Sequence, residues 1–153
     1  MLRKLLSIIF VLLCVITLTS SASAAMNDGY NKMPAEGQMM QDDYTVKIAM
    51  TPELGSFLVD GQGRTLYYFM KDMPMVSNCK GKCAEVWPPF YVEKATVPQM
   101  LNPQDFGMIT REDGMMQTTY KNWPLYYFSK DETPGDTKGQ GFNNLWFIIK
   151  VNQ

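Results

Sequence analysis

Methionine is the residue type whose abundance and spacing could support chemistry in this sequence. The 153 residues include 13 methionines and no histidine. Met70, Met73 and Met75 fall close together in the stretch FMKDMPM. Thioethers are soft, uncharged ligands that favour Cu(I) or Ag(I), and the lack of histidine favours Cu(I) over Cu(II). The spacing therefore predicts a Cu(I) or Ag(I) site made by these three side chains.

Core packing is the alternative use of the same methionines, because Met fills irregular gaps and packs well on aromatic rings. Met70 alternates with Leu66 and Tyr68, as residues on one face of a strand do. We therefore expect Met70 to be a core residue rather than a ligand. Met73 and Met75 lie in a proline-containing turn with less reason to be buried, and they are the better ligand candidates.

Two cysteines, Cys79 and Cys83, follow the methionines in the stretch NCKGKC. An exported protein meets an oxidising compartment, so a disulfide is the default expectation. The loop that it closes is small, and its stabilising effect should be modest and local. The alternative is a pair of thiolates that binds a soft metal together with the neighbouring methionines.

Catalytic patterns are missing from the chain. Without histidine there is no Ser-His or Cys-His pair and no common zinc site. There is also no GxSxG, Walker-type or HExxH motif. The formal net charge is −1 and no basic block stands out, so nucleic acid is not an expected partner. The sequence predicts a non-enzymatic binding protein, and the Cu(I) ion considered above is its one candidate cofactor.

The first residues are typical of a secretory signal peptide. Arg3 and Lys4 precede an apolar run that is too short for an ordinary membrane span, and Ala22-Ser23-Ala24 fits a cleavage site. We expect a signal peptide at 1–24, a flexible Met-rich arm at 25–43 and a single β-domain at 44–153. The product should be exported to the periplasm or the cell exterior, and an extracytoplasmic protein is an alternative partner to a metal ion.

A repeat organises the rest of the chain. LYYFMKD (66–72) and LYYFSKD (125–131) lie 59 positions apart, and the same offset places Trp87 on Trp146. We predict two copies of one unit, with cores at about 57–92 and 116–151. Each copy has an aromatic strand, a polar loop and a Trp-led strand. The expected fold is a small antiparallel β-domain built from two related repeats, with at most a short helix between them.

The repeated heptapeptide predicts a strand covered on both faces, because its alternate residues are apolar or aromatic on either side. The aspartate that ends each copy is expected to accept backbone N–H groups of the following turn. We therefore assign a structural role to the repeated positions, which are Tyr67, Phe69, Asp72, Tyr126, Phe128 and Asp131. Three tryptophans offer an alternative function, an aromatic surface for a protein, carbohydrate or haem-type partner: Trp87, Trp123 and Trp146.

The repeated motif Tyr-x-Phe-x-x-Asp resembles that of a bacterial secreted and lipoprotein repeat family named for a Tyr-x-aromatic-x-x-Asp motif. The match continues in Cys79-x-Gly81-x-Cys83-Ala84, in Trp87-Pro88-Pro89 and in Pro134-Gly135-Asp136. Many members look like lipoproteins, whereas Cys14 of this chain lies inside the apolar run. The resemblance implies export and a two-copy β-domain, and it implies no settled activity.

Overall fold

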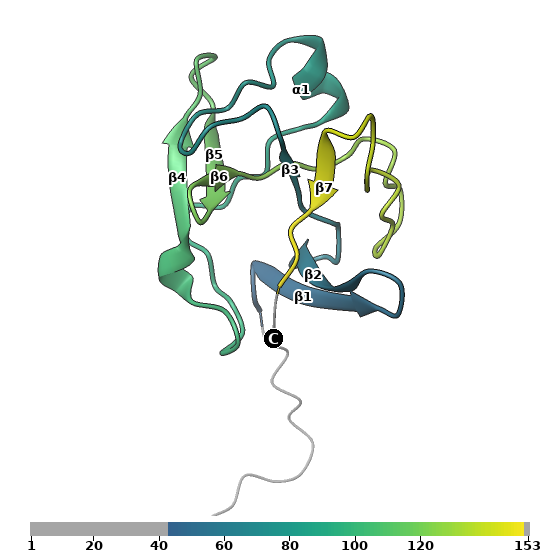
Figure 1. Cartoon of the computed structure of the whole chain (residues 1–153). Helices are drawn as coiled ribbons and strands as arrows, with labels where there is room; N and C mark the ends of the chain where they lie inside the picture. Colours follow the sequence, from purple (N-terminus) through teal and green to yellow (C-terminus); the bar gives the residue numbers. More distant parts are fainter. Residues whose placement is uncertain (1–42, 152–153) are drawn as a thin grey trace, which may run out of the picture. The chain divides into compact units, whose positions relative to one another are not determined.

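The computed structural model describes residues 43–151, which form a mainly β structure, as predicted (Figure 1). Its elements in chain order are β1 (Val46–Thr51), β2 (Gly55–Asp60), β3 (Tyr67–Phe69), α1 (Lys82–Val86), a 3-10 turn (Pro103–Asp105), β4 (Phe106–Thr110), β5 (Met116–Tyr120), β6 (Trp123–Pro124) and β7 (Trp146–Ile148). The predicted signal peptide, and the arm except for Asp43, lie outside the described residues. Within 43–151, no helix has the length and apolar character needed to cross a membrane.

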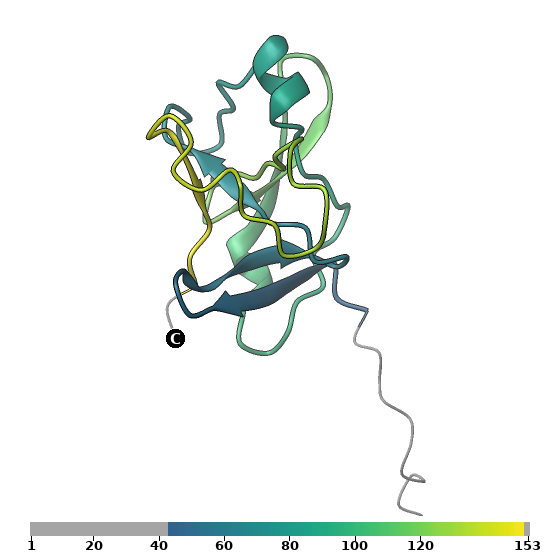
Figure 2. The ribbon, with the colours of Figure 1, turned by 90° about the vertical axis from the view of Figure 1, so that its right-hand side faces the viewer.

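Three small antiparallel sheets make up the described domain: β1–β2, β3–β7 and β4–β5–β6. The sheet of β3 and β7 joins the aromatic strand of the first repeat to the Trp-led strand of the second, with Phe69 opposite Trp146. Helix α1 and the β1–β2 hairpin lie at opposite ends of the domain in both ribbon views (Figures 1 and 2). The two repeats are therefore interleaved rather than folded as separate units.

The helical segments differ from the sequence prediction. A short 3-10 turn does lie between the repeats; it begins at Pro103 and ends where Phe106 takes an extended conformation. The α-helix, however, lies inside the first repeat and contains Cys83. The backbone N–H of Trp87 donates to the carbonyl of Cys83 at 2.8 Å, so this helical turn leads directly from the cysteine loop to the buried tryptophan.

The two heptapeptides also differ from each other. The first forms β3, whereas the second makes only bridge contacts at Tyr126, with Tyr67 and with Pro89. Neither extends as a strand to its aspartate, because both chains turn after the phenylalanine: Asp72 N donates to Phe69 O and Asp131 N donates to Phe128 O, each at 3.0 Å. The predicted strand is thus shorter than the repeated sequence.

Both faces of each heptapeptide are covered, as the alternation predicts. Tyr67 and Phe69 belong to one hydrophobic cluster, together with their counterparts Tyr126 and Phe128. Leu66 and Leu125 belong to a second cluster on the other side, against which Tyr68 and Tyr127 pack. Burial of large aromatic side chains in both clusters is the main stabilising contribution expected for a domain of this size.

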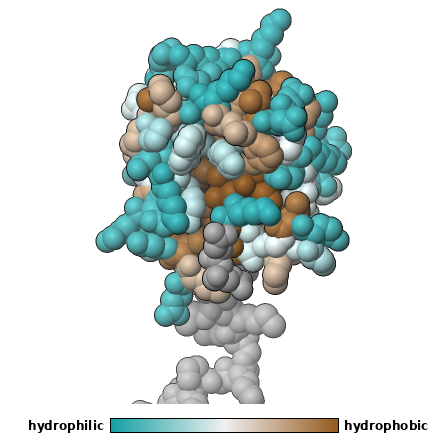
Figure 3. Space-filling view, in the orientation of Figure 1, coloured by the Kyte–Doolittle hydropathy of each residue, from teal (hydrophilic) through white to brown (hydrophobic). Residues whose placement is uncertain are grey.

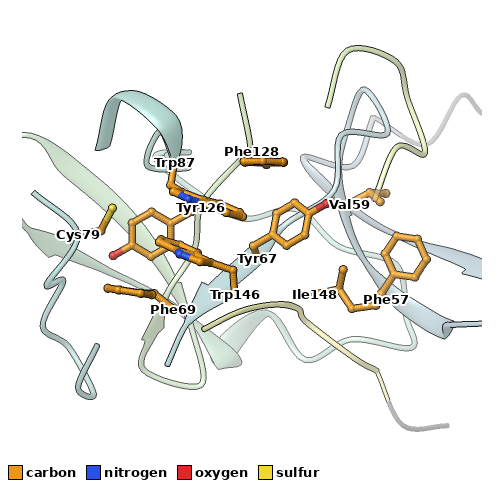
Figure 4. Packing of buried hydrophobic residues seen from close by; sticks show 10 residues of the cluster. All are labelled: Phe57, Val59, Tyr67, Phe69, Cys79, Trp87, Tyr126, Phe128, Trp146 and Ile148. Carbon is orange, nitrogen blue, oxygen red and sulfur yellow. The ribbon is translucent and has the colours of Figure 1, made fainter. Parts of the chain in front are cut away.

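Four stacked rings form the centre of the first cluster (Figure 4). Trp87 and Trp146 are parallel, with ring centroids 3.9 Å apart. Phe128 stacks on Trp87 and Phe69 stacks on Trp146, each at 4.2 Å. Because Trp146 and Phe128 lie 59 positions after Trp87 and Phe69, the stack is symmetric about the boundary between the repeats. Each repeat supplies one tryptophan and one phenylalanine, and neither repeat could form the stack alone.

Candidate functional site

The motif tyrosines and aspartates pair between the repeats. The Tyr67 hydroxyl donates to Asp131 Oδ2 at 2.6 Å, and the Tyr126 hydroxyl donates to Asp72 Oδ2 at 2.7 Å. Between them the backbones of Tyr67 and Tyr126 exchange two hydrogen bonds of 2.9 Å. The tyrosine of each copy therefore fixes the aspartate of the other copy. Sequence reasoning missed this exchange, although buried tyrosine hydroxyls that need partners were a signal for it.

Each aspartate also holds the loop that follows it. Asp72 Oδ1 accepts the backbone N–H of Asn78 at 2.6 Å, and Asp131 Oδ1 accepts that of Lys138 at 3.0 Å. Asp72 is buried, whereas Asp131 is half-buried. Desolvation raises the pKa of both carboxyl groups, against hydrogen bonds that lower it. These contacts tie the start of each loop to the ring stack.

Arg111 is a buried residue that sequence reasoning missed, since an arginine beside a predicted turn gives no signal of burial. Its guanidinium donates to Ser77 Oγ at 2.6 Å, to Gln117 Oε1 at 2.7 Å and to the Cys79 carbonyl at 2.7 Å. Ser77 Oγ lies 2.7 Å from the Tyr126 hydroxyl. Because the single hydroxyl hydrogen of Tyr126 is donated in its hydrogen bond to Asp72, Ser77 must be the donor in the hydrogen bond between Ser77 and Tyr126. The network fixes the cysteine loop to β5 and to the second repeat.

The disulfide between Cys79 and Cys83 is present, as predicted. The Cys79 side chain is fully buried in the cluster of stacked rings. With both sulfurs in the disulfide, neither cysteine is available as a thiolate ligand. Among residues 43–151, no group of three or more histidine, cysteine, aspartate or glutamate side chains is placed to hold a metal ion. Thioethers are the soft ligands left in this part of the molecule.

The three predicted thioether ligands lie on the surface, in a segment that we call the methionine turn (residues 70–76). Met70 is 54% exposed, Met73 55% and Met75 46%. The core position expected for Met70 is therefore wrong: β3 ends at Phe69, and the turn that follows carries Met70 out of the strand alternation. The structure brings the three residues to one exposed segment of the first repeat.

The backbone of the methionine turn is held in place at several points. Met73 and Val76 exchange two hydrogen bonds, of 3.1 and 2.9 Å, around Pro74 and Met75. Met75 has a positive φ of 63°, and its N–H donates to the Asn122 carbonyl at 2.7 Å. Asn78 Nδ2 donates to the Lys71 carbonyl at 2.6 Å. The exposed methionine side chains therefore extend from a backbone that hydrogen bonds hold in place.

The three tryptophans do not form the common aromatic surface that the sequence offers as an alternative function. Trp87 is 3% exposed and Trp146 is 4% exposed, so these two belong to the core. The prediction that they form a surface for a partner is therefore wrong. Their stacking on each other and on the phenylalanines explains the burial. Trp123 in β6 is half-exposed and packs edge-on against Tyr68, with ring centroids 6.2 Å apart.

These features define a class of protein: a β-domain built from two repeats whose motif tyrosines and aspartates pair crosswise around a stack of four rings. The chain belongs to the family described as a secreted repeat of unknown function, whose model matches it twice, at residues 48–91 and 107–150. This confirms the resemblance seen in the sequence, and the family description suggests export. The comparison with curated proteins and the comparison with solved structures found no match.

Proposed function

We propose that this protein is an exported, non-enzymatic binding module that holds one Cu(I) or Ag(I) ion through the thioethers of Met70, Met73 and Met75. The observation that carries the proposal is the position of the three side chains. All are about half exposed or more on one turn, and Met75 holds a left-handed backbone conformation there. Thioethers are the protein ligands that favour these soft ions.

Core packing does not account for the methionines of the described domain. Of the eight between residues 43 and 151, seven are exposed and Met116 is half-buried. Burying a methionine side chain stabilises a fold by about 1.5–3 kcal/mol relative to leaving it exposed. The exposed methionines provide little of this stabilisation. A different use of the sulfur atoms explains why methionine, rather than a polar residue, occupies the exposed turn.

The conformation of Met75 supports the same conclusion. At a positive φ, glycine or asparagine is the usual residue, and a larger side chain costs about 1–3 kcal/mol. Met75 follows Pro74 within a two-residue loop, where glycine would form the turn without strain. A strained residue that is also exposed points to a function of its side chain rather than to a need of the fold.

The fixed backbone favours binding because the ligands need little further ordering. The hydrogen bond from Asn78 N to Asp72 Oδ1 closes the turn, and the Asn122 carbonyl anchors its tip at Met75. Only the side-chain torsions of the methionines remain to be fixed when an ion binds. A smaller ordering cost leaves more of the metal–sulfur interaction energy as affinity.

An anaerobic Cu(I) titration of the mature protein against a competing chelator tests the proposal. We expect one-to-one binding that is lost in Met73→Leu/Met75→Leu, a change that conserves side-chain volume approximately. The matched control is Met100→Leu/Met108→Leu, which alters two exposed methionines elsewhere and should bind as the wild type does. Met39→Leu/Met40→Leu tests the predicted arm in the same way. Equal affinity of the turn variant and the wild type would refute the site.

A further inference from the structure

An apolar groove lies on the face of the molecule seen in Figure 1, and Figure 3 shows hydrophobic side chains gathered there beside the end of β7. Its aromatic residues are Tyr68, Tyr120 and Trp123, and it also contacts the buried side chains of Ile148 and Ile149. The groove is open to solvent on one side and has a volume of about 580 Å³. This volume lies within the range of about 300–1,000 Å³ that is usual for small-molecule sites.

The charged groups of the groove are all positive. Lys121 and Lys150 line it, and both side chains are exposed at its edge. Lys121 Nζ lies 5.3 Å from the centre of the Tyr120 ring and 3.8 Å from Asp105 Oδ2. Because that ion pair is long and exposed, it neutralises the ammonium only weakly. No carboxylate or carboxamide side chain is among the described residues that line the groove.

We propose that this groove binds a small planar aromatic anion, a conjugated ring system that carries a carboxylate. The ring would lie against the aromatic side chains, and the carboxylate would meet the lysine ammonium groups. A neutral sugar fits less well, because the lining lacks the carboxylates and amides that accept its hydroxyl groups. The site involves none of the three methionines, so the inference is independent of metal binding and goes beyond it.

A matched pair of fluorescent probes tests the proposal with the metal-free mature protein: pyrene-1-carboxylate and the neutral 1-pyrenemethanol. We expect one-to-one binding of the carboxylate, tighter than that of the alcohol by about two- to fivefold for each lysine. Lys121→Gln/Lys150→Gln should abolish that preference and leave the affinity for the alcohol unchanged. Trp123→Ala should weaken both probes by about tenfold or more.

Tyr91→Ala is the control, since Tyr91 is an exposed aromatic residue outside the groove, and it should leave both affinities unchanged. If Trp123→Ala does not fold, the lysine variant, whose two side chains are exposed, decides the result. Absence of binding, or equal binding of the two pyrenes, would overturn the proposal. So would tighter binding of cellopentaose than of the anion, or a wild-type dimer that Trp123→Ala dissociates.

Discussion

The two repeats share their core and differ in their loops. Both supply a tryptophan and a phenylalanine to the ring stack, and in both a tyrosine hydroxyl donates a hydrogen bond to the aspartate of the other copy. Around Asp72, however, the first repeat has the methionine turn, and the disulfide loop that follows is fixed by Arg111. After Asp131, the second repeat has a polar loop in which Asp136 accepts backbone N–H groups of Glu132 and Thr133.

This difference separates the residues that build the fold from those that are free to serve a function. Equivalent positions of the two repeats make equivalent contacts, because each repeat supplies core rings and hydrogen-bond partners that the other repeat needs. Apart from residues such as Ser77 and Cys79, which contact the core, the loops contribute little to that exchange, so their other positions can diverge without loss of the core. The first loop carries exposed thioethers at a strained backbone position, and we therefore place the proposed metal site there and not in the second loop.

The largest effect is expected from the central rings. Trp87→Ala and Trp146→Ala should each lower the free energy of unfolding by about 3–5 kcal/mol, because each removes a large buried side chain from the stack. Since the two indoles are equivalent across the repeats, the losses should be similar. Urea denaturation followed by circular dichroism measures both. A loss confined to one variant would break the proposed equivalence.

The crossed hydrogen bonds should give a smaller and unequal effect. Tyr126→Phe leaves the buried Asp72 without its hydroxyl donor and should cost about 1.5–3 kcal/mol, the range for hydrogen bonds to charged groups. Tyr67→Phe should cost less, because Asp131 is only half-buried and water can replace the hydroxyl. The same denaturation experiment compares them. Equal losses would mean that burial of the carboxylate does not govern the cost.

Loss of the disulfide should affect one repeat only. Cys79→Ala/Cys83→Ala should cost up to about 2 kcal/mol, since the closed loop is short. Amide hydrogen exchange should become faster from Ser77 to Val86 and stay unchanged around Asp136 in the second loop. Faster exchange in both loops would show that the disulfide supports the whole domain rather than the first repeat.

The pH dependence should be the smallest effect. The pKa of Asp72 is raised in the folded protein above its ordinary value of 3.8, so ionisation opposes folding. Stability from this group is fully present below pH 3.8 and is lost as pH rises through the higher folded pKa. Unfolding free energies of wild type and Asp72→Asn, measured from below that pH to neutral, should converge on acidification. The difference should be smaller for Asp131→Asn, whose position is less buried.

Periodicity and repetition predicted the parts of this fold that depend on local sequence. The cysteines pair as expected, and the aromatic residues of both heptapeptides pack on the two sides that alternation predicts. The ring stack, the crossed bonds and Arg111 were not predictable, because each depends on how the two halves meet. Met70 was misplaced because alternation was extended beyond Phe69, where the chain turns.

The central claim is that one exposed turn of the first repeat binds a soft metal ion. Titration of Ag(I) into protein labelled at the methionine methyl carbons tests it most directly, because NMR follows each thioether separately. We predict that the methyl signals of Met70, Met73 and Met75 shift together and saturate at one equivalent, while those of Met100 and Met108 stay in place. Shifts spread over all the methionines, or no shift in the methionine turn, would contradict the account.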